Sequence, residues 1–228
     1  GTLLTPAARH RPWDLASRVA SVDRLSGGRV TLGVGLGALH GNWLAFEADE
    51  GRAVRARKLD EVLDVYAGLM GGQPFSYTGE YFSASPVTEL VPPPPVQTPH
   101  PPVWCVGLMV PGRSRQRSLE RAARWQGVFP AIAGGSLENP GSQLTPPALR
   151  ELVERLGALR AEAGQTMQGY DVVVEGDSHG EFGTVHPPVE QWADAGATWW
   201  VESWWDLPDS PEGRAELRRR LELGPPRT

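Results

Sequence analysis

The sequence of 228 residues predicts an α/β fold with a parallel sheet. Short apolar runs alternate six times with amphipathic stretches of about 10 to 20 residues, the pattern of strands joined by crossover helices. A segment at 73–101 interrupts the alternation, and we expect residues 1–228 to form a single domain with this segment as an insertion. Periodicity leaves open whether the units form an open doubly wound sheet or part of an eight-unit barrel.

The first units are read from apolar spacing and from the residues that stop each element. Residues 2–5 form a short apolar run that Pro6 ends, as expected of a buried strand. Apolar residues recur at helical spacing over 12–25, and a Gly-Gly pair follows them. Residues 29–37 predict a strand that runs into a glycine turn, and 55–70 predict a second helix.

The insertion differs in character from the rest of the chain. Residues 75–82 predict a small hairpin around Thr78 and Gly79. A proline-rich stretch at 92–95 follows and leads back to the alternating pattern.

The second half continues the alternation of strands and helices. Strands are expected at 102–108, 127–130, 170–175 and 197–201. Helices are expected at 114–125, from Thr145 as a cap to 163, at 187–195, and from Ser210 as a cap to 223.

Composition excludes several classes of protein and of site. A formal net charge of −5 argues against a general nucleic-acid binder. Basic clusters at 52–58 and 218–220 have acidic neighbours and predict solvated helix faces. We expect no membrane span, no secretion signal and hence a cytoplasmic protein. The single cysteine, Cys105, predicts a core residue, and the scattered histidines show no metal-ligand spacing, so no metal site is expected.

The tryptophans are unusually numerous and gather near the C-terminus. The chain has 9 of them, and five lie between Trp192 and Trp205. Trp199 and Trp200 suit a core-facing strand, but they also suit the aromatic wall of a pocket for a planar ligand. Both interpretations stay open at this point.

Several motifs, in order and over nearly the whole chain, resemble the luciferase-like monooxygenase family of flavin- and F420-dependent enzymes. Two of them are Asp23-Arg24-Leu25-Ser26-Gly27-Gly28-Arg29 and Leu32-Gly33-Val34-Gly35-Leu36-Gly37. The other matching segments are 1–6, 11–12, 57–61, 77–79, 101–104, 122–130, 195–202 and 224–226.

The resemblance implies a TIM-type (β/α) barrel with the cofactor ring at the carboxyl ends of the strands. Set against the family, the chain opens at what resembles the third strand. We therefore expect an N-terminally shortened barrel of about six βα units, two units or on the order of sixty residues short.

The resemblance also implies a cofactor site. The strand Thr2, Leu3, Leu4 and Thr5 would support the ring through a bulge, with a cis peptide at Leu3-Leu4 or Thr2-Leu3. Gly35, Leu36 and Gly37 would let the backbone approach the ligand closely. Their Gly-x-Gly-x-Gly spacing does not fit a dinucleotide fingerprint, because no helix opens at once. The cofactor phosphate would bind to the backbone amides of Ala133, Gly134 and Gly135. The same glycine-rich sequence is also typical of a flexible loop that binds no ligand.

The titratable group suited to proton transfer beside the glycine turn is His40, a catalytic candidate or an ordinary loop histidine. Some flavin-using relatives place an arginine near Leu36, and some F420 enzymes an acidic group near Ala38. Neither group is present here, so the resemblance leaves FMN and F420 both open.

The resemblance implies an oxidoreductase or monooxygenase that uses reduced FMN with oxygen, or F420 for hydride transfer, on a small organic substrate. It also implies a homodimer. One alternative is a non-catalytic flavoprotein or interaction protein derived from the family. Another is a fragment of a longer enzyme. The sequence names no substrate.

Overall fold

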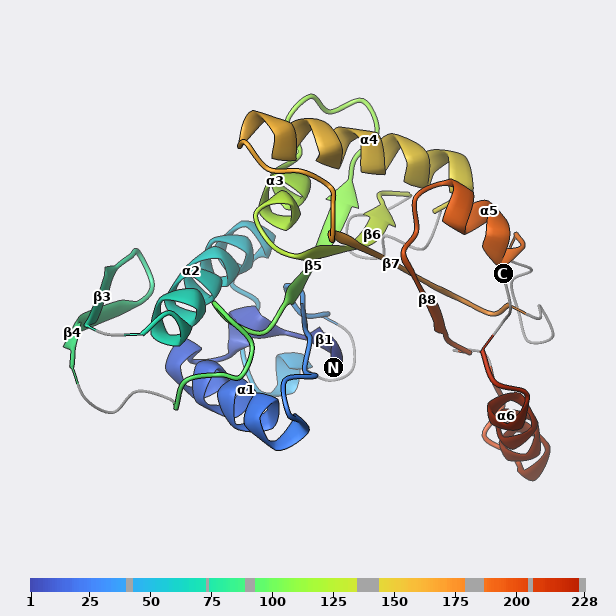
Figure 1. Ribbon diagram of the computed structural model, residues 1–228, viewed down its shortest axis with the longest axis horizontal. Helices are drawn as coiled ribbons and strands as arrows, with labels where there is room; N and C mark the ends of the chain where they lie inside the picture. Colours follow the sequence, from blue (N-terminus) through green and yellow to red (C-terminus); the bar gives the residue numbers. More distant parts are fainter. Residues whose placement is uncertain are drawn as a thin grey trace. The chain divides into compact units, whose positions relative to one another are not determined.

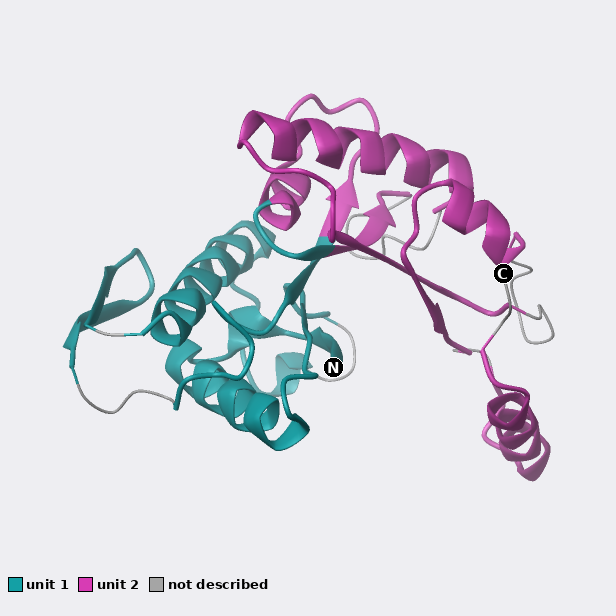
Figure 2. Cartoon of the chain, viewed as in Figure 1, with its two compact units in different colours: residues 1–106, 124–127 teal, residues 107–123, 128–228 magenta. Residues whose placement is uncertain are grey.

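A computed structural model describes residues 1–39, 43–72, 74–88, 93–134, 144–178, 187–204 and 207–225. The chain divides into two compact units (Figure 2). Unit 1 consists of Gly1–Val106 and Arg124–Gly127, and unit 2 of Gly107–Ala123 and Val128–Thr228. The expectation that residues 1–228 form a single domain stays a prediction.

Six strands form one sheet in the order β1-β2-β5-β6-β7-β8. They are β1 (Thr2–Thr5), β2 (Leu32–Val34), β5 (Val103–Met109), β6 (Gly127–Ile132), β7 (Asp171–Gly176) and β8 (Trp199–Glu202). The pairs β1/β2, β2/β5 and β7/β8 are parallel, as predicted. β1 and β8 are the two ends of the order, and closure of a barrel stays a prediction.

In unit 1, helices α1 (Pro12–Ser26) and α2 (Arg52–Met70) pack against each other (Figure 1). The buried stripe of α1 includes Leu15 and Val19, and that of α2 includes Val62 and Tyr66. α1 ends as the Gly-Gly pair predicts, because Gly27 adopts the left-handed conformation with φ 68°.

At the C-terminal end of α1, the predicted burial of the apolar residues is wrong. Val22 and Leu25 are 49% and 87% exposed, whereas Asp23 is fully buried. The carboxylate of Asp23 accepts hydrogen bonds from the backbone amides of Val96 (2.6 Å) and Gln97 (3.0 Å) and from the Gln97 side chain (2.8 Å). A buried carboxylate with three donors therefore ties the proline-rich segment to α1.

A separate two-stranded antiparallel sheet, β3 (Phe75–Thr78) and β4 (Ser83–Val87), confirms the predicted hairpin. Figure 1 shows it projecting from the end of α2. Its second strand begins later than predicted, because residues 80–82 form the turn. Their three backbone amides donate to the carboxylate of Glu61 on α2, at 2.7 to 2.9 Å.

In unit 2, helices α3 (Arg117–Ala123), α4 (Pro146–Glu162) and α5 (Val189–Asp194) lie beside strands β6 to β8 (Figure 1). The predicted caps are confirmed for α4 and for α6 (Pro211–Leu223): Thr145 Oγ1 accepts from the Ala148 amide at 3.3 Å, and Ser210 Oγ from the Gly213 amide at 3.2 Å. Within the described residues, no helix has the length and apolar character that a membrane crossing requires.

α3 is shorter than the predicted helix at 114–125. The side chain of Gln116 accepts from the Val110 amide at 3.0 Å and donates to the carbonyls of Val110 and Arg113. These bonds hold residues 110–116 as a turn, which delays the start of the helix to Arg117.

Candidate functional site

The predicted bulge is present in β1. The register between β1 and β2 shifts between Thr2 and Thr5, and the peptide bond Leu3-Leu4 is cis. Leu3 and Leu4 are 40% and 39% exposed, so the predicted burial of this strand is wrong. Two apolar side chains thus lie open beside the bulge.

The glycine turn after β2 lies directly against β1. The amide of Gly35 donates to the carbonyl of Thr5 at 3.1 Å. A Cβ built on Gly33 would lie 2.2 Å from the Thr2 carbonyl oxygen, and one on Gly35 would lie 3.5 Å from Cδ1 of Leu4. Two of the three predicted groups of cofactor-binding residues, 2–5 and 35–37, are therefore neighbours in unit 1.

Two arginines hold this turn by its carbonyl oxygens. Arg9 donates through Nη2 to Ala38 at 2.9 Å, and Arg55 donates through Nη1 to Gly37 at 2.7 Å. Their side chains are only 9% and 12% exposed. The interpretation of 52–58 as a solvated face is wrong for Arg55. No sequence pattern pointed to Arg9, which lies in a 3₁₀ helix at Ala7–Arg9.

A pocket of about 340 Å³ opens beside these arginines in unit 1. Its basic lining residues are Arg9, His10, Arg11, Arg55 and Lys58. Its acidic lining residues are Glu47, Asp49 and Glu50, and its apolar ones are Ala8, Leu44, Ala48 and Phe82. Burial, aided by the charge of Arg18 and opposed by Asp14, lowers the pKa of His10 from 6.5. The pocket is therefore rich in charge of both signs, with a histidine that favours its neutral form.

The remaining predicted residues belong to unit 2 or lie outside the described residues. Ala133 and Gly134 follow β6 in unit 2, where the Ala133 amide donates to the Met109 carbonyl at 2.8 Å. His40 and Gly135 lie outside the described residues. Their predicted roles, and that of Gly134, stay predictions.

Unit 2 holds a second polar cluster, centred on Glu202 at the end of β8. Its carboxylate accepts from the Ser178 amide (2.9 Å), Trp200 Nε1 (2.9 Å) and Trp204 Nε1 (3.1 Å), and Nη2 of Arg220 lies 3.4 Å away. Burial acts to raise the pKa of Glu202, but the hydrogen bonds from Trp200 and Ser178 and the charge of Arg220 lower it below 4.5 overall. The carboxylate is thus stabilised in its ionised form.

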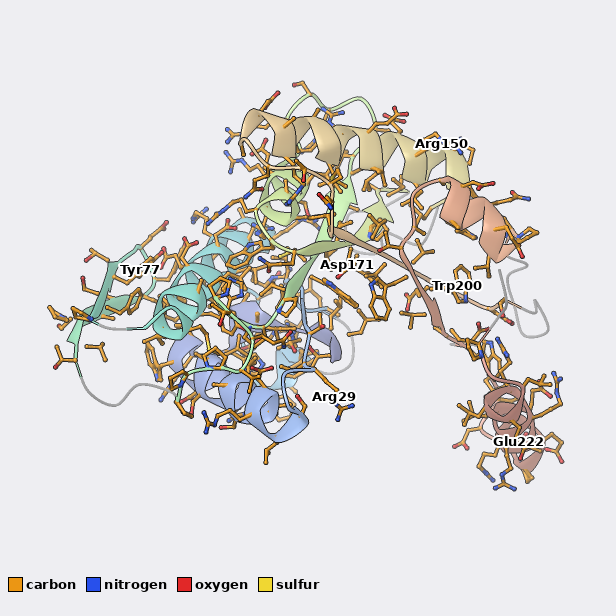
Figure 3. All side chains as sticks on the ribbon, in the orientation of Figure 1. Arg29, Tyr77, Arg150, Asp171, Trp200 and Glu222 are labelled. Atoms are coloured by element: carbon orange, nitrogen blue, oxygen red, sulfur yellow. The ribbon has the colours of Figure 1, made fainter. Side chains whose placement is uncertain are left out.

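This cluster bears on two predictions. The carboxylate of Asp171, which is labelled in Figure 3, accepts from Trp199 Nε1 at 2.8 Å. Trp199 is 51% exposed, so a core-facing position is wrong for it, and an aromatic pocket wall stays a prediction. Arg220 is 6% exposed, so the interpretation of 218–220 as a solvated face is wrong at this residue.

The described residues contain no group of three or more His, Cys, Asp or Glu side chains placed to hold a metal ion. Cys105 is fully buried in β5, as predicted.

Comparison with solved structures shows the fold. The coenzyme F420-dependent tetrahydromethanopterin reductase of Methanopyrus kandleri matches with a TM-score of 0.63 and 16% identity, over 92% of this chain and 78% of that one. Monooxygenase RslO1 of Streptomyces bottropensis matches with a TM-score of 0.55 and 24% identity, over 76% and 47%. The oxygenating constituent of 3,6-diketocamphane monooxygenase of Pseudomonas putida, in complex with FMN, matches with a TM-score of 0.55 and 18% identity, over 76% and 48%.

Comparison of sequences gives the family. Uncharacterised proteins of Mycobacterium tuberculosis and Mycobacterium bovis are 30% identical over 152 residues, which is 67% of this chain and 45% of theirs. The chain thus spans less than half the length of these curated relatives. The sequence model of the luciferase-like monooxygenase family matches residues 1–179, and the chain therefore belongs to that family.

Proposed function

We propose that the protein is an oxidoreductase that uses reduced FMN with oxygen, or F420 for hydride transfer, on a small organic substrate. The observation that carries the proposal is the contact between the β1 bulge and the glycine turn after β2. The bulge lies within β1, and the turn follows the carboxyl end of the adjacent parallel strand β2, the end of the strands where α/β sheets bind ligands. FMN and F420 appear in the names of proteins with similar folds.

The residues present fit a flat ring. Leu3 and Leu4 offer exposed apolar surface beside the glycine turn. A bound flavin or deazaflavin would supply the electron or hydride transfer. We assign the ring to Leu3, Leu4 and the turn. We assign the phosphate to the backbone amides of Gly134 and Gly135, because the amide of Ala133 already donates to the Met109 carbonyl.

The chain's own contribution would be binding, orientation and proton control. Thr2 Oγ1 donates to the Gly33 carbonyl at 3.2 Å, and Arg9 and Arg55 fix the two carbonyls of the turn. These bonds would hold the ring-facing backbone rigid. His40 is proposed to move a proton. We also propose a cytoplasmic homodimer.

A second candidate function is a flavin-binding protein without catalysis. Leu36 and Ala38 lie near the positions where the resemblance implies an arginine in some flavin-using relatives and an acidic group in some F420 enzymes. Neither side chain can stabilise charge or move a proton. On this view the ring would bind, and no substrate would turn over.

The decisive experiment is titration of FMN and of F420 into the purified protein, followed by absorbance and fluorescence. We expect one of them to bind, Leu3→Asp to weaken binding, and Leu25→Asp, on the exposed side of α1, to leave it unchanged. Binding of neither cofactor would refute the proposal. Binding without oxidation of the reduced cofactor by oxygen or by candidate substrates would favour the second function.

A further inference from the structure

An acidic segment of unit 1, Glu47 to Glu50, covers the basic side of the pocket; we call it the acidic strap. Its three carboxylates each pair with a different base. Glu47 pairs with Arg9, Asp49 lies 3.3 Å from Nε of Arg55, and Glu50 accepts from Lys58 at 2.6 Å.

The partners in these pairs are buried to very different degrees. The basic side chains are 9%, 12% and 22% exposed, whereas their carboxylate partners are 45%, 34% and 49% exposed. Every residue from Trp43 to Glu50 is exposed as a whole. Burial of apolar surface therefore contributes little to holding the strap, and its carboxylates are open enough to water for salt to screen their ion pairs.

Arg9 and Arg55, by contrast, have anchors of their own. Arg9 and Arg55 each use a second nitrogen on a carbonyl of the glycine turn, so both guanidinium groups keep a partner without the strap. Nη1 of Arg9 is buried and has no hydrogen-bond partner among the described residues. Loss of the strap would leave Arg9, Arg55 and Lys58 without these counter-charges, which favours another anion in its place.

We propose that this pocket is an anion-binding site for a phosphate or carboxylate group, which enters by displacing the acidic strap. Planar guanidinium groups match both kinds of group, and Lys58 adds a point charge. Arg11 and His10 also line the pocket. Leu44 and Phe82 would contact an apolar part of the same ligand. The proposal goes beyond the oxidoreductase function and does not depend on it.

The test measures binding of inorganic phosphate and of glutarate by calorimetry at low ionic strength, without any redox cofactor. The triple variant Glu47→Gln, Asp49→Asn, Glu50→Gln removes the internal competitor, and we expect it to bind one of the two anions at least about tenfold more tightly than the parent. The two probes separate a phosphate site from a carboxylate site.

The matched control makes the same change in net charge at exposed acidic residues of unit 2: Glu151→Gln, Asp194→Asn, Glu222→Gln. We expect the control to bind like the parent. Adding Lys58→Gln to the strap variant should abolish the gain. If the strap variant, shown to be folded by circular dichroism, binds no more tightly than the control, or if no variant binds either anion, the proposal is wrong.

Discussion

Arg9 and Gly37 approach each other so closely that a Cβ at position 37 would lie 2.5 Å from Nη1 of Arg9. Gly37 also has a φ of 84°, a conformation that residues with a Cβ rarely adopt. Position 37 therefore requires glycine for two reasons, the positive φ of the turn and the close approach of the Arg9 side chain. The two requirements can be separated by mutation.

Gly37→Ala should destabilise the protein through both effects, whereas Gly164→Ala should show only the cost of positive φ. Gly164 has a φ of 70°, and a Cβ there would meet nothing within 4 Å. We expect about 1 kcal/mol for Gly164→Ala and an additional ~1–3 kcal/mol for Gly37→Ala, because Arg9 must move. Denaturant unfolding of both variants measures the difference. If both variants lose the same free energy of unfolding, Arg9 moves away from position 37 without destabilising the protein.

Asp23→Asn should be among the most destabilising conservative changes in unit 1. The amide group would bring N–H donors where three donors already converge on a buried carboxylate. We expect a loss of about 2–3 kcal/mol in the free energy of unfolding. Asp14→Asn, on the exposed first turn of α1, should cost less than ~1 kcal/mol. A loss at position 23 no larger than that at position 14 would contradict the role of the hydrogen bonds.

Elements defined by local signals were predictable from the sequence, and elements defined by distant contacts were not. α1 stops at Gly27, and α4 and α6 begin after Thr145 and Ser210, because each signal lies within a few residues of the boundary it sets. The late start of β4 depends on Glu61, about twenty residues away along the chain, and no local pattern reveals it.

In the candidate site, too, the features that depend on distant contacts could not be predicted from local sequence signals. The bulge and cis peptide at Leu3-Leu4 were expected from family resemblance, not from periodicity, which reads these residues as a plain buried strand. The burial of Arg55 and Arg220 was missed because a charged residue in an amphipathic helix usually faces solvent. Only the folded chain brings Arg55 to the Gly37 carbonyl and Arg220 to Glu202.

Glu202→Gln should destabilise unit 2 in a pH-dependent way. The pKa of Glu202 is lowered in the folded state, so its ionised form contributes stability above its ordinary pKa near 4.5, and this contribution is lost as the pH falls through the folded-state value. We expect a loss of about 1–3 kcal/mol at pH 7 that shrinks below pH 4.5. Unfolding measured from pH 3 to 7 tests this. Glu222→Gln, on the exposed face of α6 (Figure 3), should show little loss at any pH.

Gly134→Asp tests where the cofactor phosphate binds. Gly134 directly follows the last hydrogen bond of β6, and its backbone amide is proposed to face the phosphate together with that of Gly135. A carboxylate there would meet a phosphate at short range, and like charges a few ångströms apart repel by roughly 1–4 kcal/mol at surface dielectric values. Binding of FMN or F420 should weaken at least about tenfold, and less so in high salt. Arg219→Ala, on the exposed surface of α6, should leave binding unchanged. Riboflavin lacks the phosphate, so its binding should respond to neither variant, and an equal loss of riboflavin and FMN binding would mean that Gly134→Asp acts on the fold and not on the phosphate.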